Sequence, residues 1–182
     1  MGVLKIVEWP SKVLETKAEE ITLFDESVKK LVLDMHETMK HENGIGLAAN
    51  QVNVLKRVFV VNIPWVEKDG GEEKQDWHDK AFTFINPVIT KISNEKVSYQ
   101  EGCLSFPEVY DFVGRHERVT VEAFNEKGES FSLEASGLLS ICIQHELDHI
   151  DGIVFIKRMS RLKAKLARSK INKYHLRHKT NV

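Results

Sequence analysis

The chain has 182 residues, of which 42% are hydrophobic and 29% are charged, as in an ordinary globular protein. This length has room for one domain with a substantial core. No apolar run reaches the roughly 18 residues of a membrane-spanning helix, and no signal-peptide segment opens the chain. Two cysteines are too few for a disulfide framework. We therefore predict one cytoplasmic domain over residues 1–182, with no membrane and no DNA as partners.

The formal net charge is −1, but the charges are unevenly distributed along the chain. Ten of the 26 Lys and Arg residues, and none of the 27 acidic residues, lie between Lys157 and Val182. A basic segment on an acidic body is typical of proteins with a polyanionic partner. A solvated helix face gives the same pattern, and composition alone does not separate the two interpretations.

The first part of the chain predicts an extended arm followed by a helix. The arm covers residues 3–24 and turns at Pro10. The helix covers residues 25–41, with Asp25 as its N-cap and Asn43-Gly44 after its end. Its apolar stripe consists of Val28, Leu31, Val32, Met35 and Met39.

Strands follow in the middle of the chain. We predict a buried strand over residues 56–63 and a second over 81–92, which is interrupted at Asn86-Pro87. A hairpin is predicted from 118–124 and 130–135. The charged, glycine-containing stretch 64–80 is predicted to be an exposed loop that carries no chemistry.

Two further helices are predicted near the end of the chain. One covers residues 136–151 and ends at Gly152, and the other runs from 160 to about 176 and is rich in Lys and Arg. Together the elements define an α+β fold. We expect antiparallel strands packed around the central helix 136–151, with an N-terminal helix and a basic C-terminal helix.

The central helix carries Gln144-His145-Glu146-Leu147-Asp148-His149, which contains the pattern His-Glu-x-x-His. Side chains four residues apart share one face of a helix, so His145 and His149 can bind one divalent metal. Glu146 then lies beside the metal as a general base. A hydrogen-bonded histidine pair on a core helix would have the same spacing.

A catalytic metal site of this kind needs a third protein ligand. Phe155 stands where a metzincin has its third histidine, and no acidic residue follows Asp151. His175 and His178 lie in the basic segment, so an upstream ligand is favoured. Cys103 offers a thiolate, which suits borderline and soft divalent metals. Alternatively, Cys103 is a buried packing residue or a nucleophile.

Three motifs together resemble the peptide deformylase family, in its bacterial type with a C-terminal helix. They are Gly44-Ile45-Gly46-Leu47-Ala48-Ala49-Asn50-Gln51, Glu101-Gly102-Cys103-Leu104-Ser105 and the stretch 144–149. They occur in the family's order and at similar spacing, and the resemblance covers nearly the whole chain. It implies a metal-dependent hydrolase that removes the N-formyl group from the N-terminal formylmethionine of nascent polypeptides.

The resemblance also implies a role for each motif residue. The metal ligands would be Cys103, His145 and His149. They would hold one divalent metal per chain, natively Fe(II), with Zn(II) or Ni(II) as substitutes. Glu146 would transfer protons from metal-bound water to the leaving amine, while the Gln51 amide and the Leu104 N–H would stabilise the oxyanion. Substrate contacts are expected from Gly44, Ile45, Gly46, Gly102, Leu138, Ile141 and Cys142.

By the same resemblance, the basic helix 161–182 would contact the ribosome, through salt-sensitive interactions with RNA phosphates. The chain also departs from the family's pattern. Tyr110 lies in a stretch where several bacterial members carry an Arg that holds substrate, and residues 10–15 differ from the usual Asp and Arg. We expect either altered peptide contacts beyond the methionine or a lowered activity, but not an inactive enzyme.

Two other functions share these features. A zincin-like peptidase would use the same helix to cut internal amide bonds, but the lack of a downstream third ligand counts against it. A non-catalytic, ribosome-associated protein with a structural metal would need no general base, so Glu146 counts against it.

Overall fold

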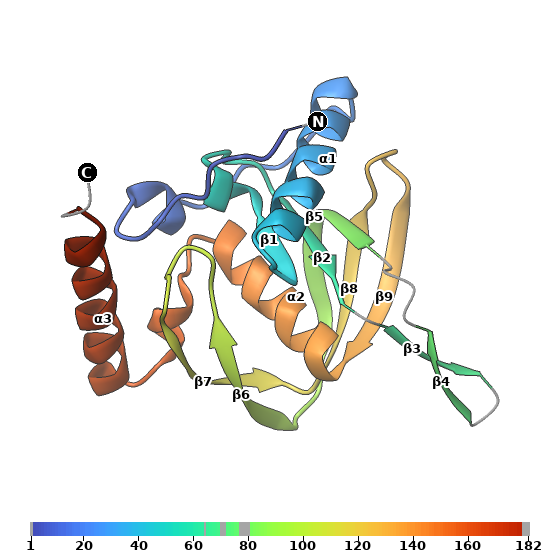
Figure 1. The fold of residues 1–182 in the computed structure, drawn as a ribbon. Helices are drawn as coiled ribbons and strands as arrows, with labels where there is room; N and C mark the ends of the chain where they lie inside the picture. Colours follow the sequence, from blue (N-terminus) through green and yellow to red (C-terminus); the bar gives the residue numbers. More distant parts are fainter. Residues whose placement is uncertain (1, 64, 70–71, 77–80, 180–182) are drawn as a thin grey trace.

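The computed structural model describes residues 2–63, 65–69, 72–76 and 81–179 (Figure 1). In chain order, the elements are the 3-10 helix η1 (Lys12–Glu15), α1 (Glu26–His41), β1 (Gly46–Ala48), the 3-10 helix η2 (Ala49–Val52), β2 (Val58–Asn62), β3 (Trp65–Asp69), β4 (Glu72–Asp76), β5 (Ala81–Ile92), β6 (Lys96–Gly102), β7 (Tyr110–His116), β8 (Arg118–Phe124), β9 (Ser130–Ser136), α2 (Gly137–Ile150), the 3-10 helix η3 (Phe155–Arg158) and α3 (Arg161–Lys179).

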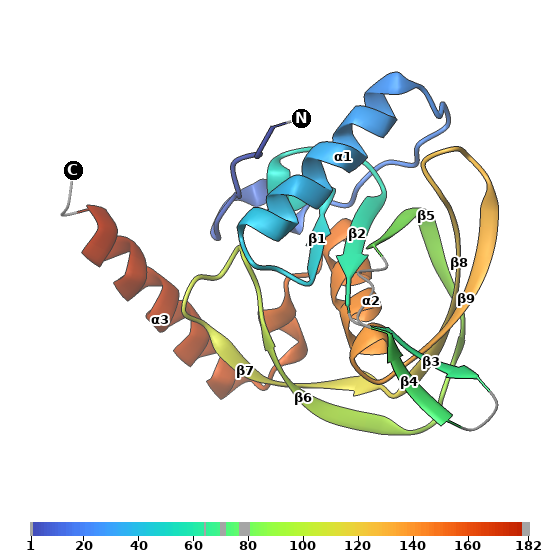
Figure 2. The same cartoon turned by 45° about the vertical axis from the view of Figure 1, so that its right-hand side comes forward.

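Helix α2 lies between two antiparallel sheets. The larger sheet has the strand order β1-β2-β5-β8-β9, and β6 pairs with β7 in a separate two-stranded sheet. Figures 1 and 2 show α2, in orange, enclosed by the curved larger sheet on one side and by β6 and β7 on another. This arrangement confirms the predicted α+β fold around the His-Glu-x-x-His helix.

Strand β2 is apolar along its length because both of its faces are covered. Phe59 and Val61 pack in the cluster that contains Cys142 and Ile143 of α2. Successive side chains of a strand point to opposite faces, so Val58 and Val60 join a second cluster. That cluster contains the apolar stripe of α1, made of Val28, Val32, Met35 and Met39.

The predicted ends of α1 are confirmed, and each has a local cause. The Asp25 carboxylate accepts hydrogen bonds from the backbone N–H groups of Ser27 and Val28, which would otherwise lack partners at the helix start. After the helix, Asn43 adopts a φ of 55°. Asn tolerates this left-handed conformation, which turns the chain toward β1.

The predicted interruption of β5 at Asn86-Pro87 is a bulge. The register of β5 against β8 shifts between Ile85 and Val88, and Asn86 has a φ of 50°. The Asn86 side chain donates to the Ile21 carbonyl (2.8 Å) and accepts from the Ile21 N–H (2.9 Å). It therefore ties the N-terminal arm to the sheet at the point where Pro87 removes a backbone donor.

The prediction of a loop over residues 64–80 is wrong where the structure describes this stretch. Residues 65–69 pair antiparallel with residues 72–76 as the strands β3 and β4. Residues 64, 70–71 and 77–80 lie outside the described residues. The high charge density suggested a loop, but a hairpin outside the main sheet needs no apolar face.

The strands β6 and β7 are absent from the sequence-based prediction. Most side chains of β6 are exposed, including those of Lys96, Ser98 and Gln100. The stretch therefore lacks the regular alternation of apolar and polar residues that marks a half-buried strand. The hairpin contributes to the core mainly through Val113 of β7.

A third apolar cluster joins α3 to the rest of the molecule. Ala167 and Ile171 of α3 pack with Leu14 of η1 and with Phe106 and Phe155. The predicted basic C-terminal helix is thus confirmed as a helix, and it is docked rather than free. Among the helices that the structure describes, none has the length and apolar character needed to cross a membrane.

Candidate metal centre and substrate pocket

Helix α2 carries two histidines on the face that points toward β6. His145 and His149 retain 8% and 1% of their accessible surface, respectively. Their rings lie 4.9 Å apart between centroids, as expected for side chains one helical turn apart. Because both are buried at the same place, the pair is available to a single bound ion.

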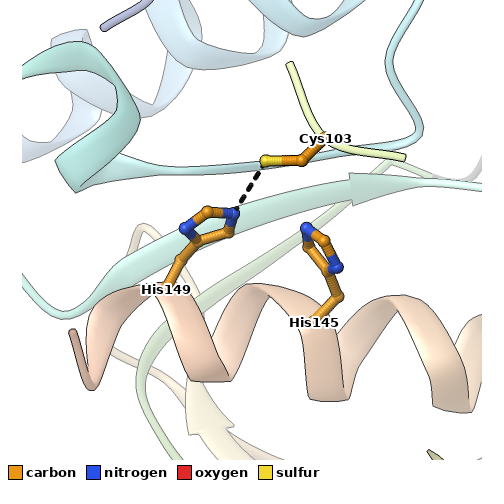
Figure 3. A group of neighbouring side chains, drawn as sticks. All are labelled: Cys103, His145 and His149. Atoms are coloured by element: carbon orange, nitrogen blue, oxygen red, sulfur yellow. Dashed lines mark hydrogen bonds between the residues drawn. The ribbon is translucent and has the colours of Figure 1, made fainter. Parts of the chain in front are cut away.

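Cys103 directly follows β6 and completes the group, as Figure 3 shows. Its Sγ lies 3.2 Å from Nε2 of His149. Ligand atoms of Cys103, His145 and His149 all lie within 4.8 Å of one another, the one such group found among the described residues. His175, by contrast, pairs with Glu8 of the N-terminal arm and is not part of this group. The structure therefore favours Cys103 over the C-terminal histidines as the third ligand.

A buried ionic network stands behind the three residues. Nδ1 of His145 lies 2.7 Å from Oε2 of Glu101, and Arg115 forms two hydrogen bonds to the Glu101 carboxylate, of 2.7 and 3.0 Å. Arg115 also donates to Asp148, whose carboxylate accepts further bonds from Arg158. The network fixes the His145 ring so that Nε2, rather than Nδ1, faces Cys103.

This network was not predicted from the sequence. Glu101 and Asp148 belong to the motifs on which the resemblance depends, so a signal for them existed. Arg115 carried no signal, because a single arginine in an unpredicted strand gives no indication that it is 4% exposed.

The electrostatics of the site favour a cation between Cys103 and Glu101. Burial lowers the pKa of His149 well below its usual value, and the charge of His145 lowers it further. Burial also acts to lower the pKa of His145, but hydrogen bonds with Cys103 and Glu101 raise that pKa well above its usual value. Burial raises the pKa of Glu101, yet the bonds from His145 and Arg115 outweigh it and leave a pKa of about 2. A divalent metal could replace the proton that gives His145 its charge, because a thiolate and two imidazoles form a suitable donor set.

Glu146 is buried beside this group, with 4% of its surface exposed. Its Oε2 atom has no hydrogen-bond partner among the described residues. Burial raises the pKa of Glu146 to about 7, with a further contribution from the charge of Glu101. A carboxyl group with such a pKa can both accept and release a proton near neutral pH.

Gln51 of η2 is oriented by its neighbours. Its Oε1 accepts a hydrogen bond from the Ala48 N–H (2.9 Å), so its Nε2 points toward Cys103 Sγ (3.5 Å) and Ser105 Oγ (3.2 Å). The amide N–H groups, and not the carbonyl, therefore face the candidate metal site. Leu104 follows Cys103, and its side chain packs near Gly44.

A cavity of about 490 Å³ opens next to these residues. It is lined by every predicted site residue except His149, which lies deeper: Gly44, Ile45, Gly46, Gln51, Gly102, Cys103, Leu104, Leu138, Ile141, Cys142, His145 and Glu146. A Cβ atom on Gly46 would collide with Glu146 and Cys142, so glycine allows these two side chains of α2 to pack directly against the segment.

The cavity has further lining residues outside the predicted set of site residues. Tyr110, which departs from the family's pattern, lies with its ring against Gly102 and is 60% exposed. Other residues come from the N-terminal arm, from β6, from the segment between β6 and β7, and from α3: Ile6, Glu8, Tyr99, Gln100, Phe106, Pro107, Glu108 and Tyr174. None of them belongs to a recognisable sequence motif, because each lines the cavity only through its place in the fold.

A thiol and two imidazoles beside a buried carboxyl group and an open cavity define the class of mononuclear metallohydrolases. Comparison with known proteins gives the family. The sequence model for polypeptide deformylases matches residues 3–165. A peptide deformylase of Neisseria gonorrhoeae is 49% identical over 173 residues, covering 95% of this chain and 96% of that protein.

Solved structures give the same result. Peptide deformylase from Ehrlichia chaffeensis superposes with a TM-score of 0.88 at 41% identity, covering 97% of this chain and 98% of that one. A structure of the same enzyme in complex with actinonin has a TM-score of 0.86 at 42% identity, covering 96% and 98%. This chain belongs to the polypeptide deformylase family, the metal-dependent hydrolases that remove the N-formyl group from nascent polypeptides.

Proposed function

We propose that Cys103, His145 and His149 hold one divalent metal and that Glu146 transfers the protons in the removal of formate from N-formylmethionyl polypeptides. One observation carries this assignment. A thiol from the end of β6 and two imidazoles from α2 have ligand atoms within 4.8 Å of one another, next to a buried carboxyl oxygen that has no partner. Buried carboxyl oxygens are normally hydrogen-bonded, so an unpaired one beside three ligand atoms supports a role in a binding site.

The proposed native metal is Fe(II), and Zn(II) or Ni(II) would fit the same donors. When bound, the metal supplies a water of lowered pKa and polarises the formyl oxygen. The role of Glu101 and Arg115 is to hold the His145 ring in the tautomer whose Nε2 is free to bind.

The chain's own residues would then carry the hydrolysis of the formyl amide. Glu146 accepts the proton of the attacking water and delivers it to the leaving amine nitrogen. Nε2 of Gln51 and the backbone N–H of Leu104 donate hydrogen bonds to the oxyanion that develops on the formyl carbon. Gly46 allows the substrate backbone to approach, because it has no side chain.

The methionine side chain would occupy the apolar part of the cavity. Leu138, Ile141 and Cys142 line it from one turn of α2, and Ile45 with Gly44 lines it from the opposite segment. Burial raises the pKa of the Cys142 thiol well above its usual value, so this residue stays neutral and acts as an apolar surface. Gly102 would contact the peptide backbone.

The proposed partners are nascent polypeptides and the ribosome, and the proposed location is the cytoplasm. Support for ribosome contact comes from α3, whose buried face contains Ala164, Ala167 and Ile171. Many of its Lys and Arg residues are exposed, so they remain available for RNA phosphates.

Formate release from formyl-Met-Ala by anaerobically purified protein, with its metal content assayed, tests the proposed function. We expect stoichiometric metal and turnover in the wild type. Glu146→Gln should retain the metal and lose at least about 10²-fold in kcat, because proton transfer then lacks its carboxylate. Bound metal without formate release from several formyl peptides, or full activity of Glu146→Gln, would contradict the assignment.

A further inference from the structure

The cavity next to the candidate metal site extends to a wall made by parts of the chain that are distant in sequence. Glu8 comes from the N-terminal arm, Glu108 from the segment between β6 and β7, and Tyr174 from α3. The volume of about 490 Å³ lies within the roughly 300–1,000 Å³ of small-molecule sites. The cavity is therefore large enough for more than one amino-acid side chain.

Tyr174 is held in place on the face of α3 that meets the cavity. Its ring packs against the apolar cluster that contains Phe106 and Val109, and it lies 4.0 Å from the ring of His178 between centroids. Burial, together with the nearby charges of Glu8 and Glu108, raises the pKa of the Tyr174 hydroxyl. The phenol is therefore neutral and offers an aromatic face with a polar tip.

Two contacts fix the residues next to Tyr174 to the same wall. Nε2 of His175 lies 2.8 Å from Oε2 of Glu8, and Nη2 of Arg177 lies 2.5 Å from Oε2 of Glu108. Both glutamates line the cavity. The last turns of α3 are thus tied to two other cavity walls, and Tyr174 directly precedes the first of these ties in the sequence.

The beginning of α3 is anchored as well. Lys163 forms an ion pair of 2.6 Å with Asp111 of β7, and its Nζ lies 5.9 Å from the ring centre of Phe112. Ala167 and Ile171, in the middle of the helix, are 4% and 0% exposed. These contacts hold α3 in place along its length, and Tyr174 is the residue by which α3 lines the cavity.

We propose that Tyr174 binds the peptide residues that follow formylmethionine, which makes α3 a wall of the substrate site. This inference rests on the proposed function, in which the formyl group lies at Glu146 and the methionine side chain lies at Leu138 and Ile141. An extended chain advances by about 3.3 Å per residue. The residues that follow methionine would therefore lie outside the deep end of the cavity, along its border. There they meet the rings of Tyr110 and Tyr174, which favour an apolar or aromatic side chain.

The test compares two substrates in the full-length, metal-loaded protein. They are the dipeptide formyl-Met-Ala and the tetrapeptide formyl-Met-Ala-Phe-Ala. In the wild type, the tetrapeptide should have the higher kcat/KM. Tyr174→Ala should lower the tetrapeptide's kcat/KM about five- to tenfold more than the dipeptide's, mainly through KM, because one aromatic contact is lost.

Two further variants give the test its controls. Tyr174→Phe should keep the wild-type ratio between the two substrates, since the ring remains. Leu162→Ala changes an apolar residue of the same helix that is 69% exposed and is not among the cavity's lining residues. It should leave both rates unchanged. Should Tyr174→Ala not fold, Tyr174→Leu keeps the apolar bulk without the ring and should also lower the ratio.

The outcomes separate this inference from the proposed function. Failure of the wild type to release formate from either peptide would overturn the proposed function itself. Formate release with an unchanged ratio in Tyr174→Ala or Tyr174→Leu would overturn the role of Tyr174 alone. An equal fall for both peptides would also overturn it, because that result indicates a general disturbance of the site.

Discussion

At the scale of single residues, the candidate site depends on side chains that are not among its proposed metal ligands. Glu101 is 6% exposed and bridges Arg115 to His145. In the proposed site its ionised form would make the His145 imidazole a stronger ligand, because a carboxylate at Nδ1 increases the electron density at Nε2. The motif Glu-Gly-Cys-Leu-Ser thus supplies both a proposed ligand and the group that orients another proposed ligand.

Glu101→Gln should weaken metal binding about 10- to 100-fold, as is typical when the partner of a ligating histidine is changed. The amide can still accept a hydrogen bond from His145, but it carries no charge. Competition with a chromogenic chelator measures the affinity, and thermal unfolding checks that the variant is folded. Glu95→Gln is the matched control, because Glu95 pairs with Arg118 on the surface, where both side chains are at least 60% exposed. Equal metal affinity in folded Glu101→Gln and the wild type would contradict this role.

At the scale of elements, bulges and turns place the functional segments. The bulge in β5 lets Asn86 pair with Ile21, which holds the N-terminal arm against the sheet. The same arm contains η1, which packs in the apolar cluster that supports Phe106 and α3. A local irregularity in one strand thereby contributes to the border of the cavity.

Asn86→Ala should lower the free energy of unfolding by about 1–3 kcal/mol, since two hydrogen bonds disappear and alanine adopts the positive φ less readily. Asn86→Gly should recover the part of this loss that comes from the backbone conformation. Urea unfolding curves provide the measurement. Asn94→Ala changes an exposed asparagine and should have little effect. A loss in Asn86→Ala no greater than in Asn94→Ala would exclude the proposed tie between arm and sheet.

The elements also show what the sequence can predict. Helix α1, the strands β2, β5, β8 and β9, and helix α2 follow from apolar periodicity and turn residues, because each packs one or both faces in the core. The hairpin of β6 and β7 lacks this signal, since most β6 side chains are exposed. The candidate site was predicted largely through three motifs. The assembly of the site depends on Cys103 lying next to His145 and His149, which are 42 and 46 residues further along the chain, and periodicity cannot indicate such a contact.

At the scale of the whole molecule, α3 has two faces with different environments. One face is buried against η1, η3 and the segment after β6, and it contributes Tyr174 to the cavity. The other face is exposed and basic. The basic run was evident from composition, but the docking of the helix was not, because the small residues Ala164 and Ala167 form only a narrow apolar stripe. Removing the whole helix would therefore disturb the core as well as any partner contact.

A charge variant avoids this problem in testing the proposed ribosome contact. Lys165, Lys170 and Lys173 are exposed, and none of them lines the cavity beside the metal site. Replacing all three with Gln should weaken binding to ribosomes and reduce the dependence of log K on log salt, because each lost phosphate contact removes roughly 0.7–0.9 from the slope. Cosedimentation at several salt concentrations measures both quantities. Deformylation of formyl-Met-Ala should stay at the wild-type rate, which separates docking from catalysis. Unchanged ribosome affinity at low salt would exclude this face as the docking surface, and α3 would then serve the substrate site and the core alone.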